Sequence, residues 1–299
     1  MNRRQSLGGG GARGFISLKG KNLTYLHIAQ NNVIMNNKFG EREVNMKKGF
    51  TLAEVLITLG IIGVVAALTM PTLMSNYRKH QTVTQLKKAY SEISQAIRLS
   101  ESKYGTLETW DFANIGAGTG SLQERNDYFA ENYLFPNIKV LKKCSPSSSE
   151  CWADYVTTLN GIKDLSNKEG HSSFITASGY SVLYWLHGED SASNGMGGWF
   201  YIDTNGPKKP NKIGIDIFAF VMSWGASQTS PETSCPRRLG LLPPDIACLD
   251  RNLTRDDIKN GTNLEKTSFA CNSSQYGTSC SSLIMVDGWE IKDDYPWKW

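Results

Sequence analysis

The chain has 299 residues, of which 40% are hydrophobic and 20% charged, with a formal net charge of +4 at pH 7. A positive net charge can indicate a nucleic-acid or anionic-membrane partner, but nine of the 32 Lys and Arg residues lie in the first 49 positions. No period of about 20 to 50 residues repeats, which argues against a solenoid.

The first 45 residues are rich in Gly, Asn and Arg and show no sustained apolar period, which is typical of a disordered segment. Residues 41–46 can be encoded by codons that contain a bacterial ribosome-binding sequence at a suitable distance from the Met46 codon. We therefore predict that Met46 is the true start and that residues 1–45 are an upstream artefact. A genuine cytoplasmic extension is the alternative.

A short basic leader opens a long apolar stretch. Residues 46–54 read Met-Lys-Lys-Gly-Phe-Thr-Leu-Ala-Glu, and no residue from Val55 to Tyr77 is charged. A helix needs about 20 apolar residues to cross a bilayer core, so a membrane-spanning half is predicted at about residues 52–76. An ionised carboxylate such as Glu54 costs about 2.5 kcal/mol or more at depth in a membrane, and such residues usually have a function and a partner.

Residues 48–56, Lys-Gly-Phe-Thr-Leu-Ala-Glu-Val-Leu, closely resemble the processing site of type IV prepilins and of the pseudopilins of type II secretion. The resemblance implies that a prepilin peptidase cuts after Gly49 and methylates the new amino terminus at Phe50. It further implies that Glu54 pairs with the terminal amine of a neighbouring subunit, which gives a buried acid the opposite charge that a low dielectric demands. Pro71 also matches a family position and should bend the helix, because it removes one helical hydrogen bond.

An ordinary cleaved signal peptide is the alternative for this segment. The run Val65-Ala66-Ala67 imitates a small-residue cleavage site and would leave Leu68 as the mature amino terminus. Signal-peptide apolar regions are shorter, however, at about 7 to 15 residues. This interpretation also leaves Glu54 unexplained.

Processing after Gly49 would reverse the sign of the net charge. Residues 1–49 hold nine Lys or Arg and two Glu, so the mature chain carries 23 basic against 26 acidic residues, or about −3. We interpret the remaining basic residues as solvated surface charges, with a lipid-headgroup or DNA contact as the alternative. They include Arg78, Lys79, Lys87, Lys88 and Arg98 on the helix, and the pair Lys208 and Lys209.

The helix is expected to continue past the span. Apolar residues recur at spacings of three and four, which predicts one amphipathic face. Gly105 follows a polar turn and predicts the stop, so residues 50–105 should form one helix, roughly 75 Å long at 1.5 Å per residue. The face comprises Leu86, Ala89, Tyr90, Ile93, Ala96 and Ile97.

Residues 106–299 suffice for one globular domain. A helix is predicted from Leu122 to Leu134, followed by an antiparallel meander of aromatic and branched strands. We therefore predict an α+β fold in which a long N-terminal helix, transmembrane and then amphipathic, packs on a small antiparallel sheet; pilin resemblance implies the same. Periodicity leaves residues 283–291 open between a short helix and a last strand. The predicted strands are 180–186, 199–203 and 215–224.

The cysteines all follow the span in polar, loop-rich sequence. Their even number predicts three disulfides and an oxidising compartment for the C-terminal region. Of the 15 possible pairings we favour the sequential one, because Ser and Gly residues allow the first and last loops to close. A zinc site is the alternative, but no Cys-x-x-Cys pair occurs and the domain holds only His171 and His187 as histidine ligands. The cysteines are Cys144, Cys151, Cys235, Cys248, Cys271 and Cys280.

A run of oxygen-bearing residues follows the second predicted strand. Asp203, Asn205 and Asp216 stand at positions that resemble the opening of a calcium loop, although the closing glutamate of an EF-hand is absent. Major pseudopilins bind calcium in a loop of loosely similar composition. Asp and Asn with Gly and Pro are equally typical of a tight turn between strands, so both interpretations stay open. No other cofactor is expected.

The sequence predicts a structural subunit and no enzyme, because no Gly-x-Ser-x-Gly, Walker or His-Glu-x-x-His pattern occurs. Pilin resemblance implies a single-pass protein of the bacterial inner membrane, with a periplasmic domain that later enters a pilus or pseudopilus fibre. The implied partners are the prepilin peptidase, other pilin or pseudopilin subunits, the inner-membrane assembly platform and the lipid bilayer.

Two further functions are alternatives. One is a minor pilin whose loops at 226–270 bind a surface, a ligand or DNA. Nucleic acid is not the expected partner: the aromatic tail at 295–299 is a candidate for stacking on bases, but a packed tail fits it better. The other is a secreted binding protein with an ordinary signal peptide.

Overall fold

The computed structural model describes residues 49–110, 121–144, 148–162, 170–186, 196–223, 238–247, 252–264 and 266–299. The chain divides into two units, residues 1–54 and residues 55–299. The predicted start at Met46 and the leader as far as Lys48 lie outside the described residues.

The long helix α1, Leu52–Tyr104, runs without interruption through Pro71. Its apolar residues up to Tyr77 are exposed, and its most apolar 18-residue stretch has a mean hydropathy of 2.3 with no part buried in the chain. The helix ends directly before Gly105, whose φ of +89° is a conformation that glycine adopts without strain. α1 therefore begins as a membrane-length apolar rod and stops where the sequence predicts.

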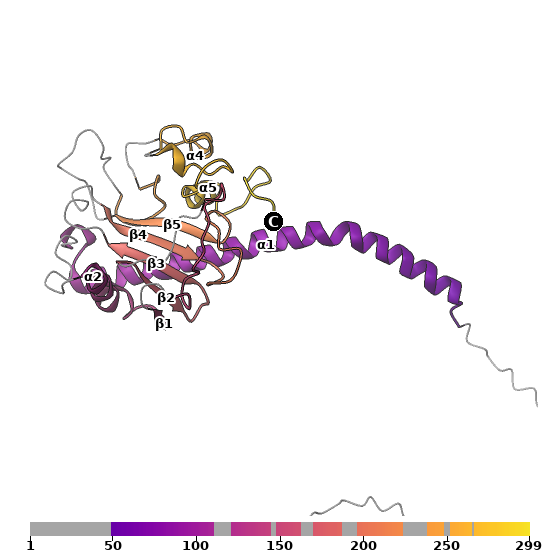
Figure 1. Ribbon diagram of the computed structural model, residues 1–299, viewed down its shortest axis with the longest axis horizontal. Coiled ribbons are helices and arrows are strands. Elements are labelled where there is room, and N and C mark those ends of the chain that lie inside the picture. The colour runs from indigo at the N-terminus through magenta and orange to yellow at the C-terminus, as the bar shows by residue number, and fades with distance from the viewer. Residues whose placement is uncertain are drawn as a thin grey trace, which may run out of the picture. The chain divides into compact units, whose positions relative to one another are not determined.

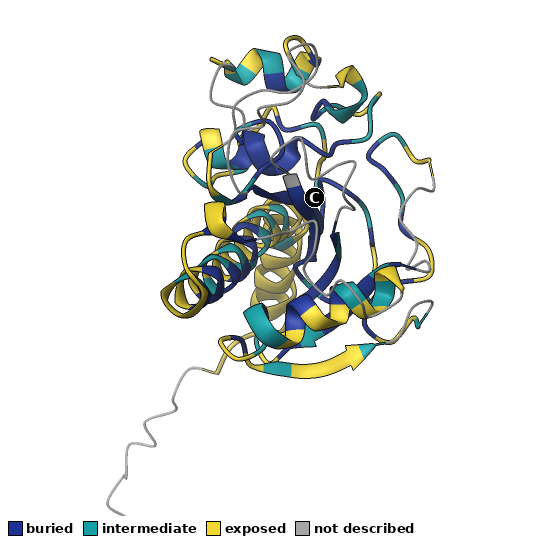
Figure 2. Cartoon of the chain, turned by 90° about the vertical axis from the view of Figure 1, so that its left-hand side faces the viewer, coloured by how far each residue is buried: buried dark blue, intermediate teal, exposed yellow. Residues whose placement is uncertain are grey.

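The second half of α1 packs against the domain through one face. Figure 2 shows the change along the helix, from exposed over the apolar half to a buried stripe farther on. Tyr90 is half-buried and stacks on Phe220, with ring centroids 5.5 Å apart, and contacts the tilted ring of Trp289 at 5.3 Å. The predicted face is confirmed, with Val83 added at its start. Its buried residues are Val83, Leu86, Ala89, Ile93, Ala96, Ile97 and Ser100.

The described strands form one six-stranded antiparallel sheet in which each strand pairs with the next along the chain. This meander lies against the second half of α1 (Figure 1). The fold is the predicted α+β arrangement. The strands are β1 Val140–Cys144, β2 Ser172–Thr176, β3 Ser181–Leu186, β4 Met196–Asp203, β5 Ile217–Ser223 and β6 Gly240–Leu242.

Both faces of the sheet are covered. Alternate residues such as Tyr184 and Phe220 point into the core that α1 supplies, whereas Leu183 and Ala219 point into a second cluster around Trp152. Period-two alternation therefore places an apolar side chain on each face, which is why every residue of β5 is buried.

Short helices connect and cap the sheet. The predicted helix at 122–134 is present, but it changes to a π-helical turn after Phe129. It begins with a capping box in which Ser121 and Glu124 bond each other's backbone N–H groups. The elements are α2 Leu122–Phe129, the π turn Ala130–Leu134, α4 Arg255–Asn260, α5 Cys280–Val286, and 3₁₀ turns at Leu107–Thr109 and Thr267–Phe269.

Several strand predictions need correction. β1, β2 and β6 were not predicted, and β4 begins at Met196, three residues earlier than expected. The predicted strand began after Gly198, but Gly198 pairs with β3, and a Cβ there would lie 2.4 Å from the carbonyl oxygen of Trp185, so only glycine allows the strands to pair. The open segment 283–291 begins in helix α5.

Two disulfides are present among the described residues, and no described cysteine is free. They join Cys144 to Cys151 and Cys271 to Cys280, which are the first and last of the three expected pairs. The other predicted pair falls on Cys235 and Cys248, which lie outside the described residues.

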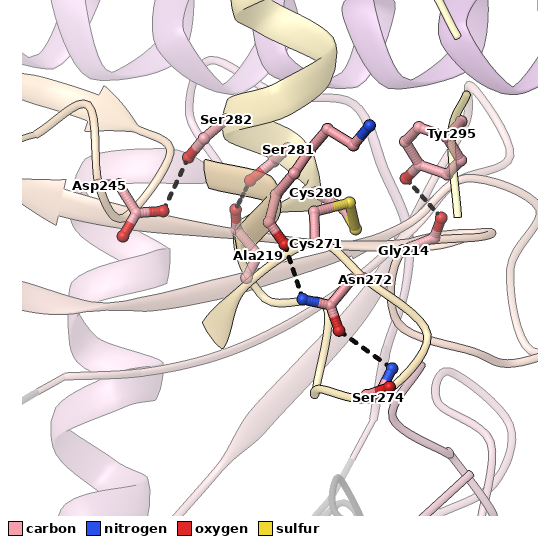
Figure 3. Close-up of a disulfide and its surroundings, with 11 residues drawn as sticks. Gly214, Ala219, Asp245, Cys271, Asn272, Ser274, Cys280, Ser281, Ser282 and Tyr295 are labelled. Carbon is pink, nitrogen blue, oxygen red and sulfur yellow. Dashed lines mark hydrogen bonds between the residues drawn. A yellow bond between two sulfur atoms is a disulfide. The ribbon is translucent and has the colours of Figure 1, made fainter. Parts of the chain in front are cut away.

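The second disulfide joins the start of α5 to the segment that follows the 3₁₀ turn Thr267–Phe269 (Figure 3). Ser281 donates a hydrogen bond of 2.6 Å to the carbonyl oxygen of Ala219 on β5. Tyr295 donates one of 2.6 Å to the carbonyl oxygen of Gly214. The C-terminal region is thus tied to the sheet and to the loop before β5.

Replacing Ile93 by Ala should destabilise the domain by about 2 to 5 kcal/mol, because the side chain is fully buried and leaves a cavity. Thermal unfolding of the full chain in detergent measures the effect. Ile62→Ala is the matched control, since Ile62 is 62% exposed on the same helix and its loss should leave the unfolding temperature unchanged. An equal loss in both variants would contradict the assigned packing.

Candidate functional site

The predicted cleavage site directly precedes α1. Gly49 and Phe50 lie outside regular structure, and the Phe50 side chain is 89% exposed. No heavy atom lies within 4 Å of the position that a Cβ on Gly49 would occupy. The described residues therefore leave this peptide bond accessible to a protease.

Glu54 takes part in a capping box at the first turn of α1. Its Oε2 accepts hydrogen bonds from the Thr51 backbone N–H at 2.8 Å and from the Thr51 hydroxyl at 2.9 Å. In return, the Glu54 N–H donates to Thr51 Oγ1 at 3.2 Å. The sequence analysis missed the role of Thr51, although the Thr-x-x-Glu spacing is the signal for such a box.

The box provides hydrogen bonds to Oε2 and to the backbone N–H of Glu54 but supplies no opposite charge. Both of its partners are neutral groups of Thr51, and the described residues place no cation in an ion pair with Glu54. The geometry thus fixes where the carboxylate lies at the start of the apolar helix. It leaves the charge available to a partner.

The loop between β4 and β5 brings the predicted calcium residues together. Asp203 is fully buried and Asp216 is 3% exposed. The Asn205 backbone N–H donates to Asp203 Oδ1 at 3.1 Å, and its side-chain amide lies 3.4 Å from Asp216 Oδ2. Asp216 also accepts the backbone N–H groups of Asn211 at 2.9 Å and Lys212 at 2.7 Å.

Two buried oxygens of this loop lack a hydrogen-bond partner in the described structure: Asp203 Oδ2 and Asn211 Oδ1. The described residues contain no cluster of three or more His, Cys, Asp or Glu that could hold a metal. A cation here would therefore depend on amide and carbonyl oxygens in addition to the two carboxylates, a ligand set that Ca²⁺ accepts.

Burial raises the pKa of both carboxyl groups. The pKa of Asp203 lies well above its ordinary value because of desolvation and then the negative charge of Asp216. Burial raises the pKa of Asp216 to about 6, although hydrogen bonds from the backbone N–H groups of Lys212 and Asn211 lower it in part. The folded state therefore favours protons on this pair, which a bound cation could replace.

The aromatic tail packs on the domain. Tyr295 is buried and its ring lies 5.6 Å from that of Trp299, whereas Trp297 is 36% exposed. This favours the packed tail over a stacking platform for bases. Of the binding loops expected at 226–270, residues 226–237, 248–251 and 265 lie outside the described structure, whereas the rest of the segment includes β6 and α4.

Comparison with known proteins covers both parts of the chain. A family with the description "Family of unknown function (DUF6613)" matches residues 72–299, about three quarters of the sequence. The chain belongs to this family. A second match, to the "Prokaryotic N-terminal methylation motif", covers residues 44–70 and includes Gly49, Phe50 and Glu54 of this family member.

A curated relative agrees with the N-terminal match. The family member is 27% identical over 73 residues to "Prepilin peptidase-dependent protein D" of Escherichia coli (strain K12), an alignment that covers 24% of the chain and 49% of that protein. The chain thus spans about half the length of the relative. No solved structure matches the chain significantly.

These findings support a pilin-like or pseudopilin-like protein with an N-terminal methylation motif. They point to a structural protein rather than an enzyme. The exposed apolar helix and the motif together fit anchoring in a membrane.

The stability of this pilin-like domain should fall as pH rises through the titration of Asp203 and Asp216. Their folded-state pKa values are raised, so the stabilisation is complete below the ordinary value of 3.8 and is lost as pH rises through about 6 for Asp216 and higher for Asp203. We expect a loss of roughly 1 to 3 kcal/mol between about pH 4 and about pH 7, without calcium.

Asp203→Asn should flatten this dependence, because it removes one buried charge and the repulsion on the other. Denaturant unfolding from about pH 4.5 to about pH 8, in a metal chelator, gives the measurement. Asp154→Asn, which removes an exposed acid, should retain the wild-type profile. Identical profiles for wild type and Asp203→Asn would contradict the assigned pair.

Proposed function

We propose that this chain is a structural subunit of a type IV pilus or of a type II secretion pseudopilus. The observation that carries the proposal is the match of the N-terminal methylation motif to a segment in which Gly49 and Phe50 are exposed and Glu54 opens an apolar helix. Cleavage after Gly49 by a prepilin peptidase removes the basic leader. Methylation of the new Phe50 amine completes the processing.

Assembly proceeds through the apolar half of α1. Residues as far as Tyr77 have no packing partner in the described chain, so they must be covered by lipid before assembly and by neighbouring helices afterwards. The cationic amine of Phe50 in one subunit pairs with Glu54 of the next. This pairing favours one helix register over others, because a buried carboxylate without a counter-charge is costly.

The disulfides support a periplasmic location for the domain. Both described bridges lie on the C-terminal side of α1's apolar half, and disulfides form and persist in oxidising compartments. We therefore propose a single pass through the inner membrane before extraction into the fibre. The partners proposed are the prepilin peptidase, other pilin or pseudopilin subunits, and the inner-membrane assembly platform.

Processing in a host that has a prepilin peptidase should produce a chain that begins with N-methyl-Phe50. Mass spectrometry of the purified protein reads this terminus directly. A terminus at Leu68 would contradict the proposal and support an ordinary signal peptide.

Gly49→Leu is the matched variant for this measurement. A side chain at this position meets no heavy atom within 4 Å, so folding of the domain should be unchanged while the peptidase is obstructed. We expect the uncut chain to accumulate in the membrane. Normal cleavage of the variant would show that Gly49 does not direct processing.

We propose calcium as the ligand of the loop between β4 and β5. Asp203, Asp216 and Asn205 would hold the ion, and the unpartnered oxygens of Asp203 and Asn211 support the proposal. A bound cation would compensate two buried carboxylates that otherwise favour protonation.

Calcium should raise the unfolding temperature of the wild type at neutral pH by binding only the folded state. The stabilisation reaches about 2.7 kcal/mol when calcium exceeds its Kd a hundredfold. Asp203→Ala should unfold at the same temperature with calcium and with a chelator. If calcium does not raise the unfolding temperature of the wild type, the ligand proposal is contradicted and the loop is a plain turn.

A further inference from the structure

Four exposed basic residues gather at the end of the domain where α1 enters it. Arg78, Lys208, Lys209 and Lys298, here called the cationic surface, line one side of a cavity of about 760 Å³ together with the half-exposed Trp297. They come from α1, the loop between β4 and β5, and the C-terminal tail. Residues distant in sequence thus build one basic surface.

The cationic surface is not neutralised by the domain. In the described part of the chain, no carboxylate forms an ion pair with any of its four members. Asp216, which lines the same cavity, is buried, and Asp293 already pairs with Lys79 at 3.2 Å. This contrasts with the chain from Phe50 onward, which carries 23 basic against 26 acidic residues.

The structure holds these residues in place. Lys79 and Asp293 join the tail to α1 one residue after Arg78. Lys212 Nζ lies 4.9 Å from the ring centroid of Trp297, which fastens the loop to the tail. Figure 1 shows the C-terminus beside α1, in agreement with these contacts. These surface contacts link the tail to α1 and to the loop, so the basic side chains lie together around one cavity.

The position of the cationic surface follows from the length of the span. The 23 uncharged residues from Val55 to Tyr77 extend about 35 Å as a helix, which matches a bilayer core of about 30 Å. Arg78 comes next, and the cavity reaches along α1 only as far as Gln85, about 10 Å beyond it. This depth corresponds to the headgroup layer and the adjacent screening length of about 8 Å.

We propose that the cationic surface docks the domain on anionic lipid headgroups of the membrane that α1 spans. Lysine and arginine side chains this close to a membrane are attracted by its negative surface charge, and tryptophan is enriched at the same level. Docking would hold the unassembled subunit upright against the bilayer until extraction. The inference rests on the membrane insertion of α1 in the proposed function.

Lysine acetylation of the reconstituted full chain tests the docking site by site. The protein is placed in vesicles of phosphatidylcholine, or in vesicles with about a third phosphatidylglycerol, and labelling is read by mass spectrometry. We expect Lys208, Lys209 and Lys298 to react about threefold or more slowly in the anionic vesicles, an effect that high salt removes. Lys103, at the far end of α1, should react equally in both.

Paired variants locate the effect. Lys208→Gln with Lys209→Gln should abolish the lipid-dependent protection of Lys298, whereas Lys103→Gln with Lys266→Gln removes the same charge elsewhere and should preserve it. Equal labelling in both vesicle types, in protein that floats with them, would overturn docking alone. Protection that grows with protein density in neutral vesicles would assign the surface to a second copy instead. Failure to float with either vesicle type would overturn membrane insertion itself.

Discussion

The structure depends on one carboxylate at the start of an apolar helix. Glu54 is held by a capping box with Thr51, which bonds its Oε2 and its N–H but does not compensate its negative charge. In water this arrangement is inexpensive, but in lipid or in a fibre core the charge needs a cation. Cleavage before Phe50 would create that cation, an amine that can pair with Glu54 of a neighbouring chain. Processing and assembly are then consequences of the same electrostatic requirement.

The two halves of α1 lie in different environments. As far as Tyr77 the helix is apolar on all sides and exposed, and from Val83 onward a narrow buried stripe joins it to the sheet. The loop before β5 and the C-terminal tail meet the helix between these two parts, where Lys79 pairs with Asp293. The domain is thus attached to the helix directly beside the membrane-length segment, which is where basic and aromatic side chains favour a lipid surface.

Much of this could be predicted from the sequence, because the strongest signals are local. The spacing of Leu86, Ile93 and Ile97 predicted the buried face of α1, and Gly105 predicted its end. Strand β4 begins earlier than expected and includes Gly198, where the carbonyl oxygen of Trp185 on the neighbouring strand leaves no room for a side chain. This contact is long-range, so composition cannot reveal it. The cluster of Asp203 and Asp216 was predicted as a group, but their burial and raised pKa values depend on packing. Trp152, Ala153 and Val156, which cover the second face of the sheet, belong to no predicted element.

We infer that the charge of Glu54, and not its role in starting the helix, drives assembly. Two substitutions separate these roles in a host that builds the fibre. Glu54→Gln retains a capping-box partner for Thr51 but removes the charge, whereas Thr51→Ala removes the cap but retains the charge. The direct measurement is the share of processed chain recovered in sheared fibres. We expect Glu54→Gln to be cleaved but to stay in the membrane, while Thr51→Ala enters the fibre. Normal incorporation of Glu54→Gln would show that assembly does not require the charge.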